Sequence, residues 1–248
     1  MNKKIYLVIA ILVSSVQSFA GHESGGGGGV LYGKSKPVLV DFLNINPDFE
    51  DKDSHLEWNS SQINDVNTKI ELTRIIEDQV RSENSAFDLA LTIIEKWETQ
   101  FLDFTAGTIH TAFMKPLTWS FTEKNLSAPD SYLPIPTISR NNIKTAAYYE
   151  KDGRNYSVII SRKIWNDLGV LSQAGLLVHE VLRHQQIGWS NQFDEKSLQQ
   201  ATALIMLCEP HSSINQYLFY VTQNRSDLAQ YLVGNFDEVI KKYCKRVL

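Results

Sequence analysis

The segment of residues 174–189, AGLLVHEVLRHQQIGW, holds the residue types that point most directly to chemistry. His179 and Glu180 lie next to each other in an apolar stretch with helical periodicity. An imidazole can bind a metal ion, and a carboxylate beside it can act as a base toward a metal-bound water. On an ideal helix Arg183 lies about 40° around from His179, and His184 about 140°. The segment therefore places a possible metal ligand and a possible base side by side, with an arginine one helical turn after the histidine.

The pattern resembles the helix of the zincin metallopeptidases, which follows a β-sheet and carries His-Glu-x-x-His. In that family the two histidines bind one zinc ion, and the glutamate polarises the metal-bound water. The resemblance implies zinc on His179, with Glu180 as the catalytic base. Arg183 stands where the family has its second histidine. His184 can share a metal with His179 only if a π-bulge or a helix end comes between them.

A metal site in this chain needs a third ligand. One zincin branch takes it from a later helix, which makes Asp194 or Glu195 the best candidates because they open the next expected helix. His211, just after Pro210, is a second candidate. Without a metal, Glu180 would instead pair with Arg183 or His184. Asp194 or Glu195 would then only be stabilised by the helix dipole at the N-terminus of the next helix.

Arg183 decides between these interpretations. A guanidinium stays protonated, has no lone pair for a metal and repels a dication. We therefore expect Arg183 to occupy the space that a zinc ion would fill, in a charge-assisted pair with an acid such as Glu180, Asp194 or Glu195. On this interpretation the protein is non-catalytic and has no cofactor. The alternative is a zinc-dependent hydrolase, and the motif can also be accidental.

A second resemblance concerns a loose group of uncharacterised exported bacterial proteins. They carry His-Glu-x-Leu-Arg or His-Glu-x-Leu-Gly in a helix, followed by a glycine, an acidic patch and another helix. The corresponding features here are residues 179–183, Gly188 and Asp194-Glu195. This resemblance implies a zincin-derived ancestry rather than a working protease.

The elements that position these residues follow from periodicity and turn signals. Asp152-Gly153 lies between two β-rich runs and predicts a hairpin over 146–160. Apolar stripes predict helices over 66–80, 84–101, 161–168, 172–185 with Ser172 as the cap, 198–208, 214–221 and 226–243. VLVDFL at 38–43 is expected to be a strand or a short buried element. The expected fold class is α+β: mainly helical, with a small antiparallel sheet near the 172–185 helix, and zincin-like if the first resemblance holds.

The N-terminus is expected to be a cleaved secretory signal. Lys3 and Lys4 precede the apolar run Ile5–Val16, and small residues at 18 and 20 predict cleavage after Ala20. Residues 21–36 are expected to form a glycine-rich flexible tether, and residues 37–248 a single globular domain. The protein is therefore expected in the periplasm or outside the cell.

Composition narrows the choice of partners. The 248 residues include 24 Lys+Arg and 28 Asp+Glu, a formal charge of −4, with no basic patch for nucleic acid. No segment after the signal is apolar enough to span a membrane. Cys208 and Cys244 can form one disulfide in an oxidising compartment or remain two buried thiols. A protein or peptide ligand remains a possible partner of unknown identity.

Overall fold

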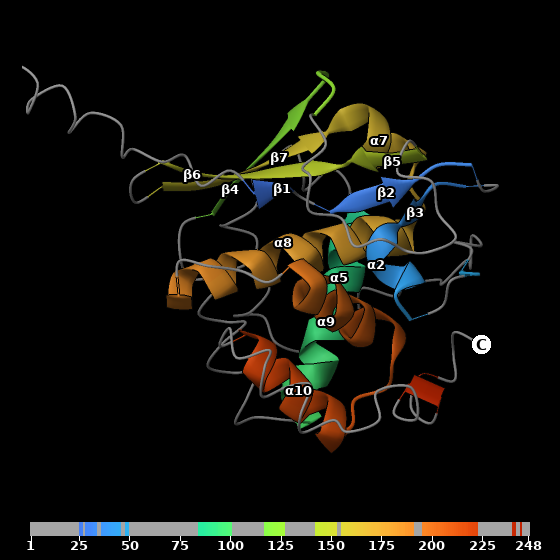
Figure 1. Ribbon diagram of the computed structural model, residues 1–248, viewed down its shortest axis with the longest axis vertical. Coiled ribbons are helices and arrows are strands. Elements are labelled where there is room, and N and C mark those ends of the chain that lie inside the picture. Colours follow the sequence, from blue (N-terminus) through green and yellow to red (C-terminus); the bar gives the residue numbers. More distant parts are fainter. Residues whose placement is uncertain are drawn as a thin grey trace, which may run out of the picture.

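The strands lie on one side of the long helices, and the short helix α7 lies with the strands. In Figure 1 the strands form the upper layer, α8 runs beneath them, and α5, α9 and α10 lie lower. The computed structural model describes residues 25–26, 28–33, 36–45, 48–49, 84–100, 117–126, 142–152, 155–190, 195–222, 240–241 and 244. The layered mixture of helices and small sheets agrees with the expected α+β class.

The larger sheet has four strands in the order β1-β6-β7-β4. Its strands are β1 (Gly25–Gly26), β6 (Ala147–Asp152), β7 (Asn155–Ser161) and β4 (Leu117–Thr122). β6 and β7 form the hairpin expected from Asp152-Gly153, with Asp152 opposite Asn155. β4 pairs with β7 in parallel, so the sheet is mixed and not wholly antiparallel as expected. No tight turn joins β4 to β7, and a long connection permits either direction.

The smaller sheet has three strands in the order β3-β2-β5. They are β3 (Val38–Leu39), β2 (Gly29–Leu31) and β5 (Ile143–Thr145), all antiparallel. The expected tether over 21–36 is therefore wrong for its glycine-rich part, because β1 and β2 pair with β6 and β5. Gly28 serves close packing instead, since a Cβ added there would lie 2.5 Å from Leu176 Cδ1.

Helix α8 (Val170–Ser190) is longer than the 172–185 helix expected from the sequence. Ser172 lies inside the helix instead of capping it. Its hydroxyl accepts a hydrogen bond from the Leu39 backbone N–H, at 3.5 Å, and so ties α8 to β3. The serine therefore joins two elements instead of starting one.

Of the remaining described helices, α5, α9 and α10 match the apolar stripes, α7 matches the expected short helical turn, and α2 lies in the VLVDFL segment. They are α2 (Val40–Leu43), α5 (Asn84–Gln100), α7 (Arg162–Asp167), α9 (Glu195–Leu207) and α10 (Ser212–Thr222). The VLVDFL segment is a two-residue strand followed by one helical turn, and all six residues are buried. The helix expected over 66–80 lies outside the described residues. So does the one over 226–243, apart from residues 240–241, which are helical.

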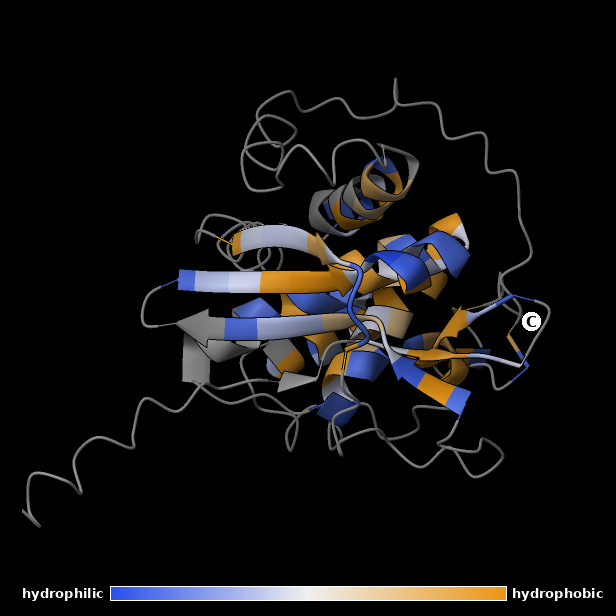
Figure 2. Cartoon of the chain, turned by 90° about the horizontal axis from the view of Figure 1, so that it is seen from above, coloured by the Kyte–Doolittle hydropathy of each residue, from blue (hydrophilic) through white to orange (hydrophobic). Residues whose placement is uncertain are grey.

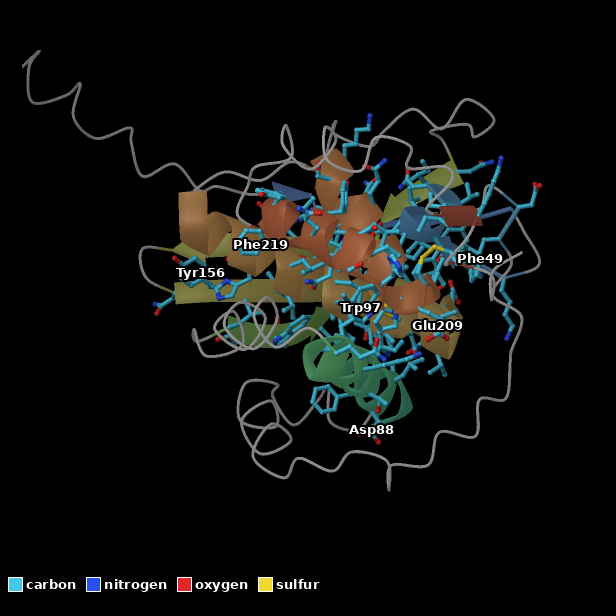
Figure 3. The ribbon with its side chains drawn as sticks, turned by 90° about the horizontal axis from the view of Figure 1, so that it is seen from below. Phe49, Asp88, Trp97, Tyr156, Glu209 and Phe219 are labelled. Atoms are coloured by element: carbon cyan, nitrogen blue, oxygen red, sulfur yellow. A yellow bond between two sulfur atoms is a disulfide. The ribbon has the colours of Figure 1, made fainter. Side chains whose placement is uncertain are left out.

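Close contacts fix the helices around α8. A Cβ added at Gly175 would lie 2.6 Å from Phe42 Cζ, so the Phe42 ring of α2 packs directly against the α8 backbone. The buried indole N–H of Trp97 on α5 donates to the Ile205 carbonyl oxygen on α9, at 3.0 Å. Figure 3 shows Trp97 in the interior and Asp88 at the outer side of α5. Figure 2 shows β7 changing from polar at its start to apolar toward its end. The core therefore lies between the sheets and the helices.

Cys208 and Cys244 form a disulfide, 36 residues apart, drawn as the yellow bond in Figure 3. This settles the choice that the sequence left open. Both residues are buried, and Cys208 directly follows α9. The bond therefore holds residue 244 against the end of α9.

Among the helices that the structure describes, none is long and apolar enough to cross a membrane.

Candidate functional site

Helix α8 buries four polar side chains within six residues. His179, Glu180, Arg183 and His184 are all fully inaccessible to solvent. Charged groups are rarely buried unless they are paired, because losing water costs several kcal/mol per isolated ion. The partners of these four residues therefore define the site.

Asp41 on α2 holds His179. Its Oδ2 lies 2.6 Å from His179 Nδ1, and both side chains are fully buried. The Nδ1–H bond therefore points at a carboxylate, and Nε2 is left facing Arg183. Sequence reasoning missed Asp41, which lies 138 residues from His179. A single acid inside the apolar VLVDFL segment was the available signal.

Arg183 lies between His179 and two acids. Its Nη2 is 3.1 Å from His179 Nε2 and 2.6 Å from Glu195 Oε2. Its Nη1 is 3.8 Å from Glu180 Oε2. The expected pairing of Arg183 with an acid is therefore present, and Glu195, the first residue of α9, makes the shorter contact.

Two further hydrogen bonds position the carboxylates. Glu195 Oε1 accepts from Gln199 Nε2 at 3.1 Å, and Gln199 Oε1 accepts from Asn44 Nδ2 at 3.3 Å. Glu180 Oε1 accepts from the backbone N–H of Gly28 at 3.1 Å. We call Asp41, His179, Glu180, Arg183 and Glu195 the buried ionic cluster. The cluster and its supporting bonds join α2, α8, α9 and the N-terminal glycine segment.

Negative groups outnumber positive ones in the buried ionic cluster. It holds three carboxylates against one guanidinium and one imidazole. Asp41 Oδ1 and Glu180 Oε2 accept no hydrogen bond from any residue that the structure describes. Burial raises the pKa of Glu195, and the charges of Arg183 and His179 oppose that rise without cancelling it. Burial therefore favours the protonated form of Glu195.

His179 responds to the same imbalance. Burial, the strongest influence, lowers its pKa, but the charge and hydrogen bond of Asp41, helped by Glu195, raise the pKa above its ordinary value overall. Arg183 acts in the opposite direction. Neutral His179 accepts from Arg183 at Nε2, whereas the imidazolium would direct Nε2–H toward Glu195 Oε1, 3.7 Å away.

His184 belongs to a different environment. Its Nδ1 lies 2.7 Å from the Tyr149 hydroxyl on β6, and the Tyr156 ring on β7 meets its ring edge-on at 4.7 Å. The α8 helix is regular from Val170 to Ser190, with no bulge between His179 and His184. The structure therefore does not bring these two histidines to one point.

The other candidate ligands are accounted for differently. His211 lies at the start of α10, where its Nδ1 accepts a hydrogen bond from the Ser213 N–H at 3.2 Å. Asp194 lies outside the described residues. Within the part of the chain that the structure describes, no three His, Cys, Asp or Glu side chains are arranged to hold a metal ion.

No known family model matches the chain, and neither a curated protein nor a solved structure matches it. The zincin resemblance therefore rests on the α8 residues and on Glu195 alone.

Arg183 is expected to dominate the stability of the cluster. We expect Arg183→Ala to lower the free energy of unfolding by about 3–5 kcal/mol, because it leaves buried carboxylates uncompensated. In a Glu195→Gln background, the loss of unfolding free energy caused by Arg183→Ala should be smaller by about 1–3 kcal/mol, since one buried charge has already gone. Urea unfolding of the four proteins measures this coupling.

Lys96→Ala provides the control. Lys96 pairs with Glu209, but both side chains are about two-fifths exposed, at 41% and 43%. Loss of such a pair should change stability by no more than about 1 kcal/mol. An Arg183→Ala effect as small as that of Lys96→Ala would contradict the ion-pair account.

The raised pKa values of His179 and Glu195 predict the direction of the pH dependence. Both groups bind protons more tightly in the folded protein than in the unfolded chain, where their ordinary pKa values are 6.5 and 4.5. Their contribution is fully present below those values and is lost as pH rises through the folded pKa values. The free energy of unfolding, measured by urea unfolding across a pH series, should therefore fall as the pH rises above these ordinary pKa values. A His179→Gln, Glu195→Gln double variant with an unaltered pH profile would argue against it.

Proposed function

We propose that this chain is a non-catalytic, zincin-like protein in which Arg183 takes the place of the metal ion. One observation carries the proposal: Arg183 Nη2 lies 3.1 Å from His179 Nε2 and 2.6 Å from Glu195 Oε2. These are the atoms that would bind zinc if the resemblance to zincins held at position 183. The guanidinium supplies the positive charge that would otherwise come from the metal.

The groups around Arg183 support this interpretation. A metal-binding histidine usually donates its second ring N–H to a carboxylate, as His179 does to Asp41. Glu195 comes from the helix after α8, which is where one zincin branch takes its third ligand. A guanidinium about 4–8 Å from a dication would repel it by roughly 4–8 kcal/mol at an effective dielectric near 20. Arginine at position 183 therefore opposes binding of a metal ion between His179 and Glu195.

Glu180 is also poorly placed for catalysis. A general base must reach a water or a substrate proton. Glu180 is fully buried, and its Oε1 accepts the Gly28 N–H. We infer that the cluster holds the fold together, and that the protein acts by binding a protein or peptide partner through its outer surface. A zinc-dependent hydrolase using His179 and Glu180 is the alternative.

We also propose that the protein is exported through a cleaved signal to the periplasm or beyond. The basic and apolar run before Ala20 supports this. The disulfide between Cys208 and Cys244 supports it independently, because such bonds persist mainly in oxidising compartments.

Metal content tests the proposed function. The protein purified without a tag or chelator should hold no stoichiometric zinc. Arg183→His should gain about one zinc per chain, because it restores the histidine pair at helical spacing. Plasma emission spectrometry measures both, and adding Glu195→Ala to Arg183→His should abolish the gain. Zinc on the unaltered protein that disappears with His179→Ala would instead establish the hydrolase alternative.

Export is tested by the N-terminal sequence of the protein recovered from its native host. Cleavage after Ala20 predicts a mature chain that begins at Gly21. The fraction of the cell that contains it should be the periplasm or the medium. A chain that begins at Met1 or Asn2, recovered from the cytoplasm, would overturn the proposed export.

A further inference from the structure

The larger sheet ends in a long outer strand. Among the described strands, β4 pairs with β7 alone, over six consecutive residues from Leu117 to Thr122. Figure 2 shows β4 as the outermost strand of this sheet, at the top of the view. At the other end of the sheet β1 has two residues, and the outer strands of the smaller sheet, β3 and β5, have two and three. Short outer strands limit pairing between sheets, and β4 lacks that protection.

β4 also lacks the other features that protect a sheet edge. Its sequence, LTWSFT, contains no charged residue and no proline. Its register with β7 is uninterrupted, so no bulge turns the edge away. Charges, prolines and bulges are the usual means by which an outer strand avoids pairing with another chain. The outer backbone groups of β4 therefore offer a template for a further strand.

Side-chain contacts hold β4 firmly in its extended form. Leu117 and Trp119 point inward and are buried. The Phe121 ring meets the Trp165 ring of α7 at nearly a right angle, with centroids 5.7 Å apart, and the Arg162 guanidinium lies 3.5 Å from the Phe121 centroid. The edge is thus already in the conformation that strand pairing requires, which lowers the entropy cost of association.

We propose that β4 pairs antiparallel with β4 of a second copy of the chain, so that the two larger sheets join into one. A two-fold axis between identical edges makes the pairing antiparallel. An identical strand is the favoured occupant because both copies then cover their long edges at once, and the joined sheet ends in the two-residue β1 on each side. An added peptide would instead become a new outer strand. This inference goes beyond the proposed function and does not require it.

The charge of the edge agrees with self-association. The whole chain has a formal charge of −4, which opposes contact between copies, but β4 itself is neutral and brings no like charges together. A single pair of six-residue strands buries less than the about 1,600 Å² of a standard interface. We therefore expect a weak, reversible dimer with a dissociation constant of about 10 µM to 1 mM.

Sedimentation equilibrium of the full mature chain tests the dimer. The mean mass should rise reversibly with concentration, from one copy toward two. Thr118→Lys, at an exposed position of β4, should raise the dissociation constant at least about tenfold, because a cation then stands on both edges. Gln216→Lys, at an exposed position of α10, is the matched control and should change it less than about twofold.

A charge exchange separates an effect on pairing from an effect on folding. Thr118→Glu alone should weaken the dimer as Thr118→Lys does. An equimolar mixture of the two variants should associate at least about fivefold more tightly than either variant alone, because opposite charges then meet across the joined edges. A substitution that only disturbed the fold would not be rescued in this way, and circular dichroism checks that both variants are folded.

The proposal is overturned if the unaltered chain remains a monomer up to about 1 mM. It is also overturned if a dimer forms but the Thr118 variants and their mixture associate as the unaltered chain does. Amide signals in nuclear magnetic resonance spectra give an independent measurement that needs no substitution. On dilution, the amides of β4 should shift while those of α10 stay constant, and a dimer that leaves the β4 amides unchanged would contradict the proposed pairing.

Discussion

Burial of the Arg183 guanidinium is the constraint on which the rest of the structure depends. A fully buried cation needs carboxylates at close range, and its own helix supplies only Glu180, at 3.8 Å. The 2.6 Å contact comes from Glu195, which fixes the start of α9 against α8. Arg183 also faces His179, whose orientation is set by Asp41 on α2. One side chain thus determines how three helices meet.

Close backbone packing makes this arrangement possible. Gly175 lies one helical turn before His179 and lets Phe42 rest against α8, which brings Asp41 within reach of the imidazole. Gly28 does the same for the N-terminal segment, because its N–H reaches Glu180 only if no side chain intervenes. Small residues therefore set the distances at which the charged residues pair. The ionic cluster and the packing of the core depend on each other.

Local signals in the sequence were sufficient for much of the fold. Asp152-Gly153 predicted the β6–β7 hairpin, and apolar periodicity predicted α5, α8, α9 and α10. The permanent positive charge of Arg183 predicted its pairing with an acid. Partners distant in sequence were not predictable. Asp41 and Gly28 join the cluster across 138 and 152 residues, and although a lone acid in an apolar segment marks Asp41 as unusual, nothing near either residue in the sequence names its partner. Glycine repeats likewise indicate flexibility unless a strand edge is known to lie beside them.

The position of Arg183 in a protein offered zinc tests the central claim most directly. Crystals grown with zinc, and measured on both sides of the zinc absorption edge, locate the metal and the guanidinium in the same experiment. The account predicts guanidinium density between His179 Nε2 and Glu195 Oε2, with no anomalous peak there. An anomalous peak within bonding distance of His179 Nε2, with Arg183 turned away from Glu195, would contradict it.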